Sequence, residues 1–180
     1  MATATTGGSL SRSDEVRSIF ITGVRNAHAL EKEAIQILER QIDRLANYPE
    51  METLVRRHLE ESRQHEQRID EVLDGLGAGR SVLKDMVMQV MGNMAAIAHV
   101  PAGDEILKNT FANHAFENFE IASYKSLIAM AEASGNQKFI PGLQESLREE
   151  EKTAKAVYDM IEPITQKFLT RSAQGLKADR

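Results

Sequence analysis

Apolar residues recur every three or four positions along most of the chain, which is the spacing of one face of an α-helix. The pattern predicts four long helices, over residues 13–46, 49–76, 104–134 and a last segment that begins near Gln137 or Pro141 and ends near Thr170. A shorter apolar segment, 81–100, predicts a short helix between the second and third. Pro163 is expected to kink or end the last helix, because its ring displaces a backbone hydrogen bond.

Turn signals divide the four long helices into two pairs. Asn47-Tyr48-Pro49 separates the first two helices, and Ser134-Gly135-Asn136 separates the last two. The pairs are joined by a long connection that holds the short helix. This order predicts an all-α, ferritin-like four-helix bundle with one long crossover carrying a short fifth helix. We expect a disordered N-terminal tail at residues 1–12, the bundle at 13–170 and a frayed C-terminal tail at 171–180.

The composition restricts the range of functions. With 180 residues, 42% of them hydrophobic and 27% charged, the chain is suited to one domain with its own core. A net charge of −5 argues against nucleic-acid binding, which needs a basic surface. The absence of cysteine excludes disulfides and thiolate chemistry. No long apolar run predicts a membrane span, and the first ten residues do not resemble a signal peptide, so we expect a cytoplasmic protein.

The second predicted helix carries polar residues within its apolar stripe. His58, Glu61 and His65 lie three and four residues apart, where a core-facing helix would have Leu or Val. A buried carboxylate is costly unless it is paired with a positive group or bound to a cation. We therefore interpret this stretch as the main candidate for a metal site.

Inward-facing glutamates recur in both helix pairs at the same interval. Glu31 and Glu61 are separated by 30 residues, and so are Glu120 and Glu150. Each interval joins the first helix of a pair to the second across a different turn, which suggests a duplicated helix pair. Antiparallel packing would bring the four carboxylates to one level of the core. Two divalent metal ions would neutralise them, and oxygen-rich ligation with imidazole suits iron or manganese.

The two halves differ in their nitrogen ligands. In the first half, His65 follows Glu61 by about one helical turn. In the second half, Thr153 and Ala154 stand at the equivalent positions after Glu150, and neither binds metal well. The second half has therefore lost its imidazole.

Another residue could supply the missing ligand. Glu117 lies one turn before Glu120, and His58 or His114 are alternatives that we interpret rather as structural or outer residues. The predicted metal ligands are Glu31, Glu61, His65, Glu117, Glu120 and Glu150. A different explanation of the inward carboxylates is that they form ion pairs across the bundle. The basic residues available for such pairs are Arg25, Arg63 and Lys125.

Four segments together resemble a known family. They are Ala29-Leu30-Glu31-Lys32, His58-Leu59-Glu60-Glu61, Glu117-Asn118-Phe119-Glu120-Ile121-Ala122-Ser123-Tyr124 and Leu147-Arg148-Glu149-Glu150-Glu151-Lys152-Thr153. Over residues 15–165 the chain resembles the YciE/YciF family, small bacterial ferritin-like proteins linked with stress responses. The resemblance implies a helical bundle with a di-metal centre, a homodimer and a cytoplasmic location. The family often has an acid where this chain has Ala154, so the last helix departs from the family pattern.

Two functions follow from this pattern. In the first, the chain is a di-iron or di-manganese protein of a bacterial stress response that oxidises iron(II) or consumes peroxide or oxygen. Tyr124, one turn from Glu120, could then be a hydrogen-bond donor or redox neighbour of the centre, although a tyrosine at such a position is more often a packing residue. In the second, it is a non-catalytic metal-binding or structural homodimer in stress protection. A helical interaction module without metal is a third interpretation. The sequence carries no separate signature of an organic substrate.

Overall fold

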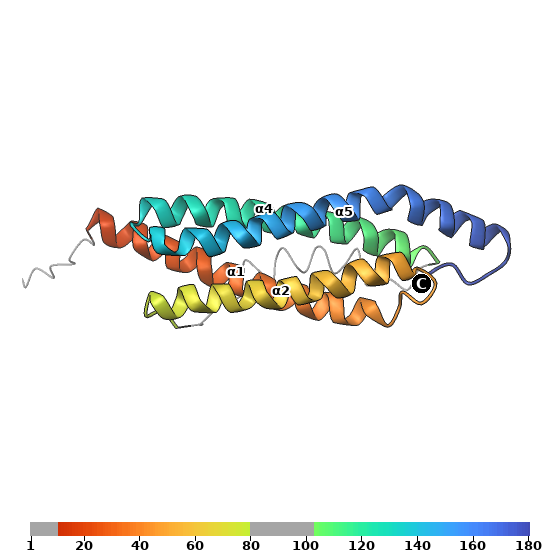
Figure 1. Ribbon diagram of the computed structural model, residues 1–180, viewed down its shortest axis with the longest axis horizontal. Coiled ribbons are helices and arrows are strands. Elements are labelled where there is room, and N and C mark those ends of the chain that lie inside the picture. The colour runs from red at the N-terminus through yellow and green to blue at the C-terminus, as the bar shows by residue number, and fades with distance from the viewer. Residues whose placement is uncertain (1–10, 80–102) are drawn as a thin grey trace, which may run out of the picture.

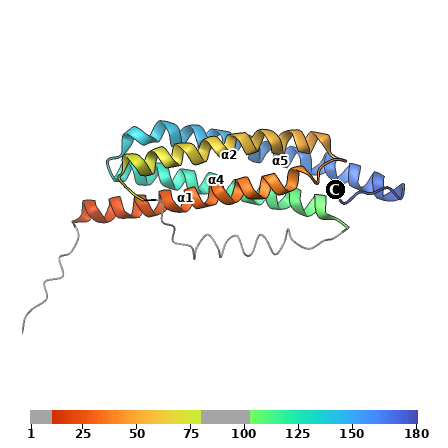
Figure 2. The same cartoon turned by 90° about the horizontal axis from the view of Figure 1, so that it is seen from below.

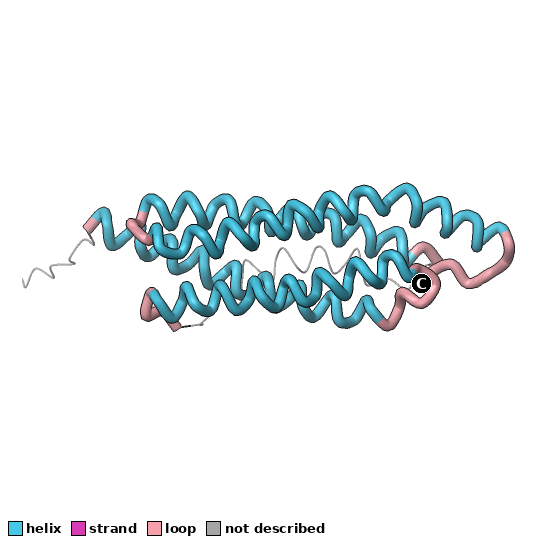
Figure 3. Tube along the Cα trace, viewed as in Figure 1, coloured by secondary structure: helices cyan, strands magenta, loops and turns pink. Residues whose placement is uncertain are grey.

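The computed structural model describes residues 11–79 and 103–180. Its long helices are α1 (Arg12–Ile42), α2 (Pro49–Gly75), α4 (Glu105–Ala133) and α5 (Ile140–Ala173), with a 3-10 turn at Gln137–Phe139 (Figures 1 and 3). This part of the chain contains no strand and no helix with the length and apolar character that a membrane crossing needs. The short helix predicted at 81–100, and residues 1–10 of the predicted tail, lie outside the described residues.

The four helices lie side by side as two antiparallel hairpins (Figures 1 and 2). α1 packs against α2, and α4 packs against α5. The hairpins meet where α1 contacts α4 and α2 contacts α5. The end of α2 and the start of α4 lie at opposite ends of the bundle. The predicted all-α, ferritin-like bundle with one long crossover is confirmed.

Local sequence signals set the helix ends. The Ser11 side chain caps α1 by accepting a hydrogen bond from the Asp14 backbone N–H. α2 begins at Pro49, whose missing N–H is not needed in the first turn of a helix. α2 and α4 are each followed by a glycine with left-handed backbone, Gly77 (φ 65°) and Gly135 (φ 74°), a conformation that costs glycine little.

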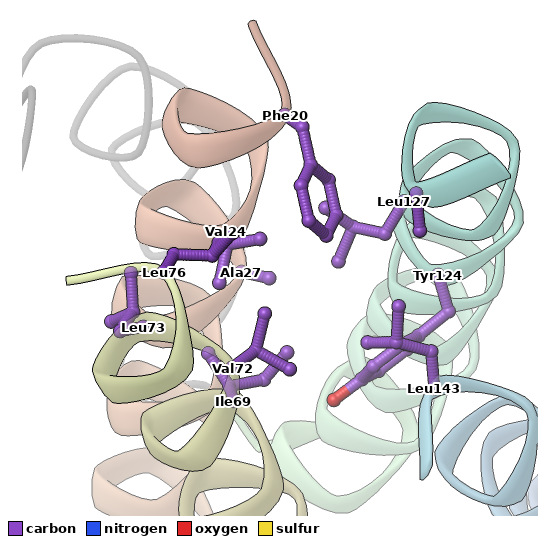
Figure 4. Packing of buried hydrophobic residues seen from close by; sticks show 11 residues of the cluster. Phe20, Val24, Ala27, Ile69, Val72, Leu73, Leu76, Tyr124, Leu127 and Leu143 are labelled. Atoms are coloured by element: carbon purple, nitrogen blue, oxygen red, sulfur yellow. The ribbon is translucent and has the colours of Figure 1, made fainter. Parts of the chain in front are cut away.

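The two largest apolar clusters of the described residues lie toward opposite ends of the bundle. The first, shown in Figure 4, consists of Phe20, Val24, Ala27, Ile69, Val72, Leu73, Leu76, Tyr124, Leu127, Ala131 and Leu143. The second consists of Leu38, Ile42, Leu45, Tyr48, Met51, Leu54, Val55, Leu59, Ile106, Val157 and Ile164. Because the chain passes from one cluster to the other along α1 and back along α2, residues midway along these helices are shielded from water at both ends.

Helix α5 continues through Pro163 and ends only at Ala173. Of the two expected effects of Pro163, the end of the helix is therefore wrong, and the kink stays a prediction. The ring removes one backbone hydrogen bond, but the next residue, Ile164, is only 2% exposed and belongs to the second apolar cluster. Burial on this face stabilises the last turns of the helix.

The last residues of the chain return to the bundle instead of fraying. The Tyr48 hydroxyl donates a hydrogen bond to the Ala178 carbonyl (2.6 Å), and the Ile106 backbone N–H donates one to the Asp179 carbonyl (2.9 Å). Ile106 lies in the first turn of α4, where backbone N–H groups lack partners within the helix. The C-terminal segment supplies one such partner, so it differs from the frayed tail that its polar sequence suggested.

Candidate metal centre

All four helices bring buried polar side chains to the middle of the bundle, between the two apolar clusters. The residues are Glu31 of α1, His58 and His65 of α2, Glu117 and Glu120 of α4, and Glu150 of α5. None of them is more than 2% exposed. They share the inward stripes of their helices with apolar core residues, so the helix geometry itself imposes their burial.

These six residues form two groups of converging nitrogen and oxygen atoms. The first group consists of His58, Glu117, Glu120 and Glu150, and the second of Glu31, His65 and Glu150. Within each group, one ligand atom of every residue lies within 4.8 Å of the others. Glu150 belongs to both groups, so the two positions adjoin. Either group could hold a metal ion.

Several of these atoms lie close together without forming hydrogen bonds. His58 Nε2 is 3.1 Å from a carboxylate oxygen of Glu117, and His65 Nδ1 is 2.8 Å from one of Glu150. Neither nitrogen has a hydrogen-bond partner among the described residues, and nor do the two oxygens of Glu120. Buried polar atoms are nearly always satisfied in folded proteins. The unsatisfied atoms fit the donor set of a metal site.

Burial and mutual repulsion disfavour the ionised form of the carboxylates. Burial raises the pKa of Glu120 well above its usual value, and the nearby Glu150 and Glu31 carboxylates raise it further. Burial also raises the pKa of Glu150 to about 7, although His65 opposes the shift. If all four carboxylates of the two groups are ionised and the imidazoles are neutral, two divalent cations balance the negative charge.

The nearby carboxylates raise the pKa of both imidazoles, which favours their charged, protonated form. Burial alone would lower the pKa of His65, but its interactions with Glu150 and Glu31 outweigh burial and raise the pKa to about 10. Burial would likewise lower the pKa of His58, and Glu117 reverses this and raises it well above its usual value. A metal ion that binds these nitrogens must displace their protons, so metal binding is coupled to proton release.

Tyr124 borders the second group. Its hydroxyl donates a hydrogen bond to Glu31, and its ring lies edge-on to His65 with ring centroids 5.9 Å apart. Figure 4 shows the hydroxyl oxygen at the margin of the first apolar cluster. Burial raises the pKa of the hydroxyl well above its usual value, and the Glu31 carboxylate adds to this shift. Tyr124 therefore keeps its proton and holds one oxygen of Glu31.

Five of the six residues predicted as ligands lie in the two groups, but Glu61 lies outside both. The Glu61 side chain is 15% exposed and accepts a hydrogen bond from Thr153 (3.3 Å), while Arg57 lies 3.6 Å away. The next residue, Ser62, is fully buried and takes the inward position. The nearby His58 ring lowers the pKa of Glu61, although partial burial opposes this shift. A ligand role for Glu61 stays a prediction.

The histidines also divide differently from the expectation. His58, interpreted from sequence as structural or outer, points Nε2 into the first group. Its spacing of seven residues from His65 along the same stripe was the signal for this position. His114 faces the Ala154 carbonyl (3.2 Å), and His28 faces Asp70 (3.1 Å), so both lie apart from the two groups.

The comparison with protein families fits this architecture. A family model described as "Domain of unknown function (DUF892)" matches residues 15–170. The chain belongs to the DUF892 family. Its solved relatives include a protein of Xanthomonas campestris pv. campestris ATCC 33913, which is 27% identical. That pair has a TM-score of 0.75 and covers 88% of this chain and 99% of the other.

Two further structures share the fold with this DUF892 chain. YcfI of Rhodopseudomonas palustris is 24% identical, with a TM-score of 0.71 over 83% of this chain and 98% of its own. The E. coli stress protein YciF is also 24% identical, with a TM-score of 0.68 over 81% of this chain and 94% of its own. The resemblance to the YciE/YciF family, predicted from four motifs, is confirmed.

Proposed function

We propose that this DUF892 protein binds two divalent metal ions, iron or manganese, in the middle of the bundle. We further propose that the loaded protein acts in a bacterial stress response, by oxidising iron(II) or by consuming peroxide or oxygen. The name of the E. coli stress protein YciF, which has the same fold, favours the stress role. The proposal includes a homodimer in the cytoplasm.

The observation that carries the metal proposal is the state of Glu120. It is 0% exposed, and within the described part of the chain neither of its carboxylate oxygens has a hydrogen-bond partner. Burying an unpaired carboxylate costs several kcal/mol, unless it is protonated or bound to a cation. The convergence of Glu117 and Glu150 on the same point favours a cation, because three carboxylates would otherwise repel one another.

The chain's own residues would bind the metal ions, position the ligands and limit the entry of water at this centre. Iron or manganese, when bound, supplies the redox chemistry toward oxygen or peroxide. His58 and His65 would each supply one nitrogen, and Glu150, which faces both groups, would supply oxygens to either position. Tyr124 holds its proton on an oxygen of Glu31. The apolar clusters on both sides would limit the entry of water.

The alternative is a protein that binds metal, or only supports a dimer, without turnover. The inequality of the two groups favours it, because one offers four residues and the other only three. Ala154, at the position equivalent to His65, adds no ligand to the second half. A centre with unequal positions could hold one ion firmly and release the other.

Elemental analysis tests the metal proposal. Protein reconstituted anaerobically with iron(II) or manganese(II) and then desalted should retain about two ions per chain. Glu120→Gln keeps the side-chain size but removes the charge, and should lose about one of the two ions, because Glu120 belongs only to the first group. Glu151→Gln is the matched control, because Glu151 is 48% exposed and pairs with Lys125 at the surface (3.0 Å). Metal-free wild-type protein after reconstitution would contradict the proposal.

Repeated turnover separates the two functions. Iron-loaded wild-type protein should consume several equivalents of hydrogen peroxide or oxygen per chain when iron(II) is supplied. A single equivalent, with the iron then remaining oxidised, would favour metal binding alone. Sedimentation of the metal-free and loaded forms measures whether the chain is a homodimer and whether this depends on metal.

A further inference from the structure

His65 has two ring nitrogens that face opposite environments. Nδ1 points to the centre, 2.8 Å from a Glu150 oxygen and 3.5 Å from a Glu31 oxygen. Nε2 points away from it, 2.9 Å from Oε2 of Glu149. The ring is fully buried, whereas the Glu149 side chain is 21% exposed. One imidazole therefore connects the centre to a carboxylate near the surface.

The Glu149 carboxylate is itself held in place. Arg68 of α2 donates a hydrogen bond from Nη1 to the same oxygen, Oε2 (2.5 Å), and donates another to the Ser146 hydroxyl (3.1 Å). An ionised carboxylate only accepts hydrogen bonds, so the proton of the His65–Glu149 contact must lie on Nε2. This arrangement leaves Nδ1 as the nitrogen that a metal ion can bind.

We propose that Glu149, fixed by Arg68, is a positioning residue that orients His65 and keeps Nδ1 directed at the metal. This inference rests on the proposed metal function and assigns a role outside both groups of candidate ligands. Metal-bound histidines commonly donate their second N–H to a carboxylate, which fixes the ring and makes the bound nitrogen more basic. Glu149 would do this for the second group only.

Within residues 11–79 and 103–180, the His58 ring of the first group has no equally close carboxylate at its outer nitrogen. His58 Nδ1 lies 3.7 Å from Oε2 of Glu61, beyond hydrogen-bond distance. The Glu61 carboxylate also accepts a hydrogen bond from Thr153 and lies near the Arg57 guanidinium. The two metal positions should therefore respond differently to loss of Glu149, and this difference distinguishes positioning from a general structural role.

Cobalt(II) titration under anaerobic conditions tests the proposal, with calorimetry and visible absorption as readouts. In wild-type protein we expect two binding events. Glu149→Ala should weaken one of them by about 10- to 100-fold and change the other by less than about threefold. Glu149→Gln should fall between wild type and Glu149→Ala, because its amide oxygen can still accept the Nε2–H bond but no longer pairs with Arg68 as a charge. Glu151→Gln should match wild type.

A readout on metal-free protein accompanies the titration. In protein with ¹⁵N-labelled histidine, the Nε2 proton of His65 should give a slowly exchanging signal that Glu149→Ala removes and Glu151→Gln keeps. Circular dichroism and thermal unfolding of metal-free protein check that the variants fold. If Glu149→Ala fails to fold, the isosteric Glu149→Gln carries the test.

The outcomes separate this inference from the function on which it rests. Two cobalt events in wild type that are the same in Glu149→Ala, Glu149→Gln and Glu151→Gln would overturn the positioning role and leave the metal function standing. Equal weakening of both events in the Glu149 variants would also overturn it, because that pattern indicates a general structural loss. Absence of cobalt binding in wild type would overturn both proposals.

Discussion

At the scale of single residues, the centre depends on a few contacts between groups that are costly to bury. Glu31 is 1% exposed, and one of its oxygens accepts the Tyr124 hydroxyl while the other has no hydrogen-bond partner in the described regions. The phenol is the neutral donor in this contact. Its removal would leave a buried carboxylate with less compensation.

Replacing Tyr124 with Phe tests this contact. In metal-free protein we expect Tyr124→Phe to lower the free energy of unfolding by about 1–3 kcal/mol, the usual cost of leaving a buried polar group without its partner. Tyr158→Phe is the control, because Tyr158 is 62% exposed. Urea unfolding monitored by circular dichroism measures both. Equal stability of the two variants would show that the buried hydrogen bond contributes nothing.

A second residue-scale prediction concerns pH. Arg44 donates hydrogen bonds to Glu105 at the start of α4, and this contact lowers the pKa of the Glu105 carboxyl below 4.5, although burial opposes the shift. A lowered pKa in the folded state contributes stability that is present above the unfolded pKa and is lost as pH falls through the folded value.

Glu105→Gln should therefore destabilise the protein at pH 7, by about 1 kcal/mol because solvent screens the half-exposed Arg44. The difference from wild type should shrink as the pH falls below 4.5. Urea midpoints at several pH values between 3.5 and 7 measure this. A difference that stays constant over that range would exclude the charged contact as its cause.

At the scale of elements, a glycine of α1 packs tightly against α4. A Cβ atom at Gly23 would lie 3.0 Å from Leu127 Cδ2 and 3.0 Å from Met130 Sδ. Leu127 is 1% exposed and belongs to the first apolar cluster, so it has little room to move. The glycine therefore allows the helices to pack at this distance, despite its low helix propensity.

Gly23→Val should lower the free energy of unfolding by about 1–3 kcal/mol through overpacking. Gly142→Ala in α5 is the control, because a Cβ there has nothing within 4 Å. The control should be neutral or slightly stabilising, since alanine favours helix. Thermal unfolding of both variants measures the difference. An unchanged or more stable Gly23→Val would contradict the tight contact.

The helices could be predicted well because each has a long apolar stripe. The stripe does not determine, however, which of the residues at its edge face the core. Glu61 and Ser62 differ by about 100° around α2, and sequence spacing allowed Glu61 to face inward. In the structure Ser62 takes the core position and Glu61 lies at the margin. Glu149 precedes the inward-facing Glu150 and was not among the predicted ligands, but its side chain reaches His65 across the α2–α5 contact. Such edge positions depend on how the helices pack, which periodicity does not encode.

At the scale of the whole molecule, the equal spacing of glutamates in the two hairpins predicted where three carboxylates meet. Glu31, Glu120 and Glu150 are buried at the same level, between two apolar clusters. The two hairpins contribute unequally, however, because both imidazoles of the two groups come from α2. The path of the C-terminal segment could not be predicted, since its hydrogen bonds with Tyr48 and Ile106 are accepted by backbone carbonyls, which leave no sequence pattern.

Metal binding should be visible in the stability of the whole molecule. A ligand that binds only the folded state raises its stability in proportion to the logarithm of the free concentration over Kd. Iron(II) or manganese(II) at 100 times Kd should therefore add about 2.7 kcal/mol and raise the melting temperature by several degrees. A chelator should reverse the rise, and Glu120→Gln should show a smaller rise than wild type, because only its first group is altered. A melting temperature that ignores metal in wild type would argue for a structural bundle.

The most direct test of the central claim is anomalous X-ray scattering from crystals of iron- or manganese-loaded protein, measured on both sides of the metal absorption edge. For a di-metal centre we expect two anomalous peaks between the helices, one beside His58 and Glu120 and one beside His65 and Glu31. Glu150 should lie next to both. Crystals of Glu120→Gln should lose the first peak. Loaded wild-type crystals with no anomalous density among these residues would contradict the proposed di-metal centre.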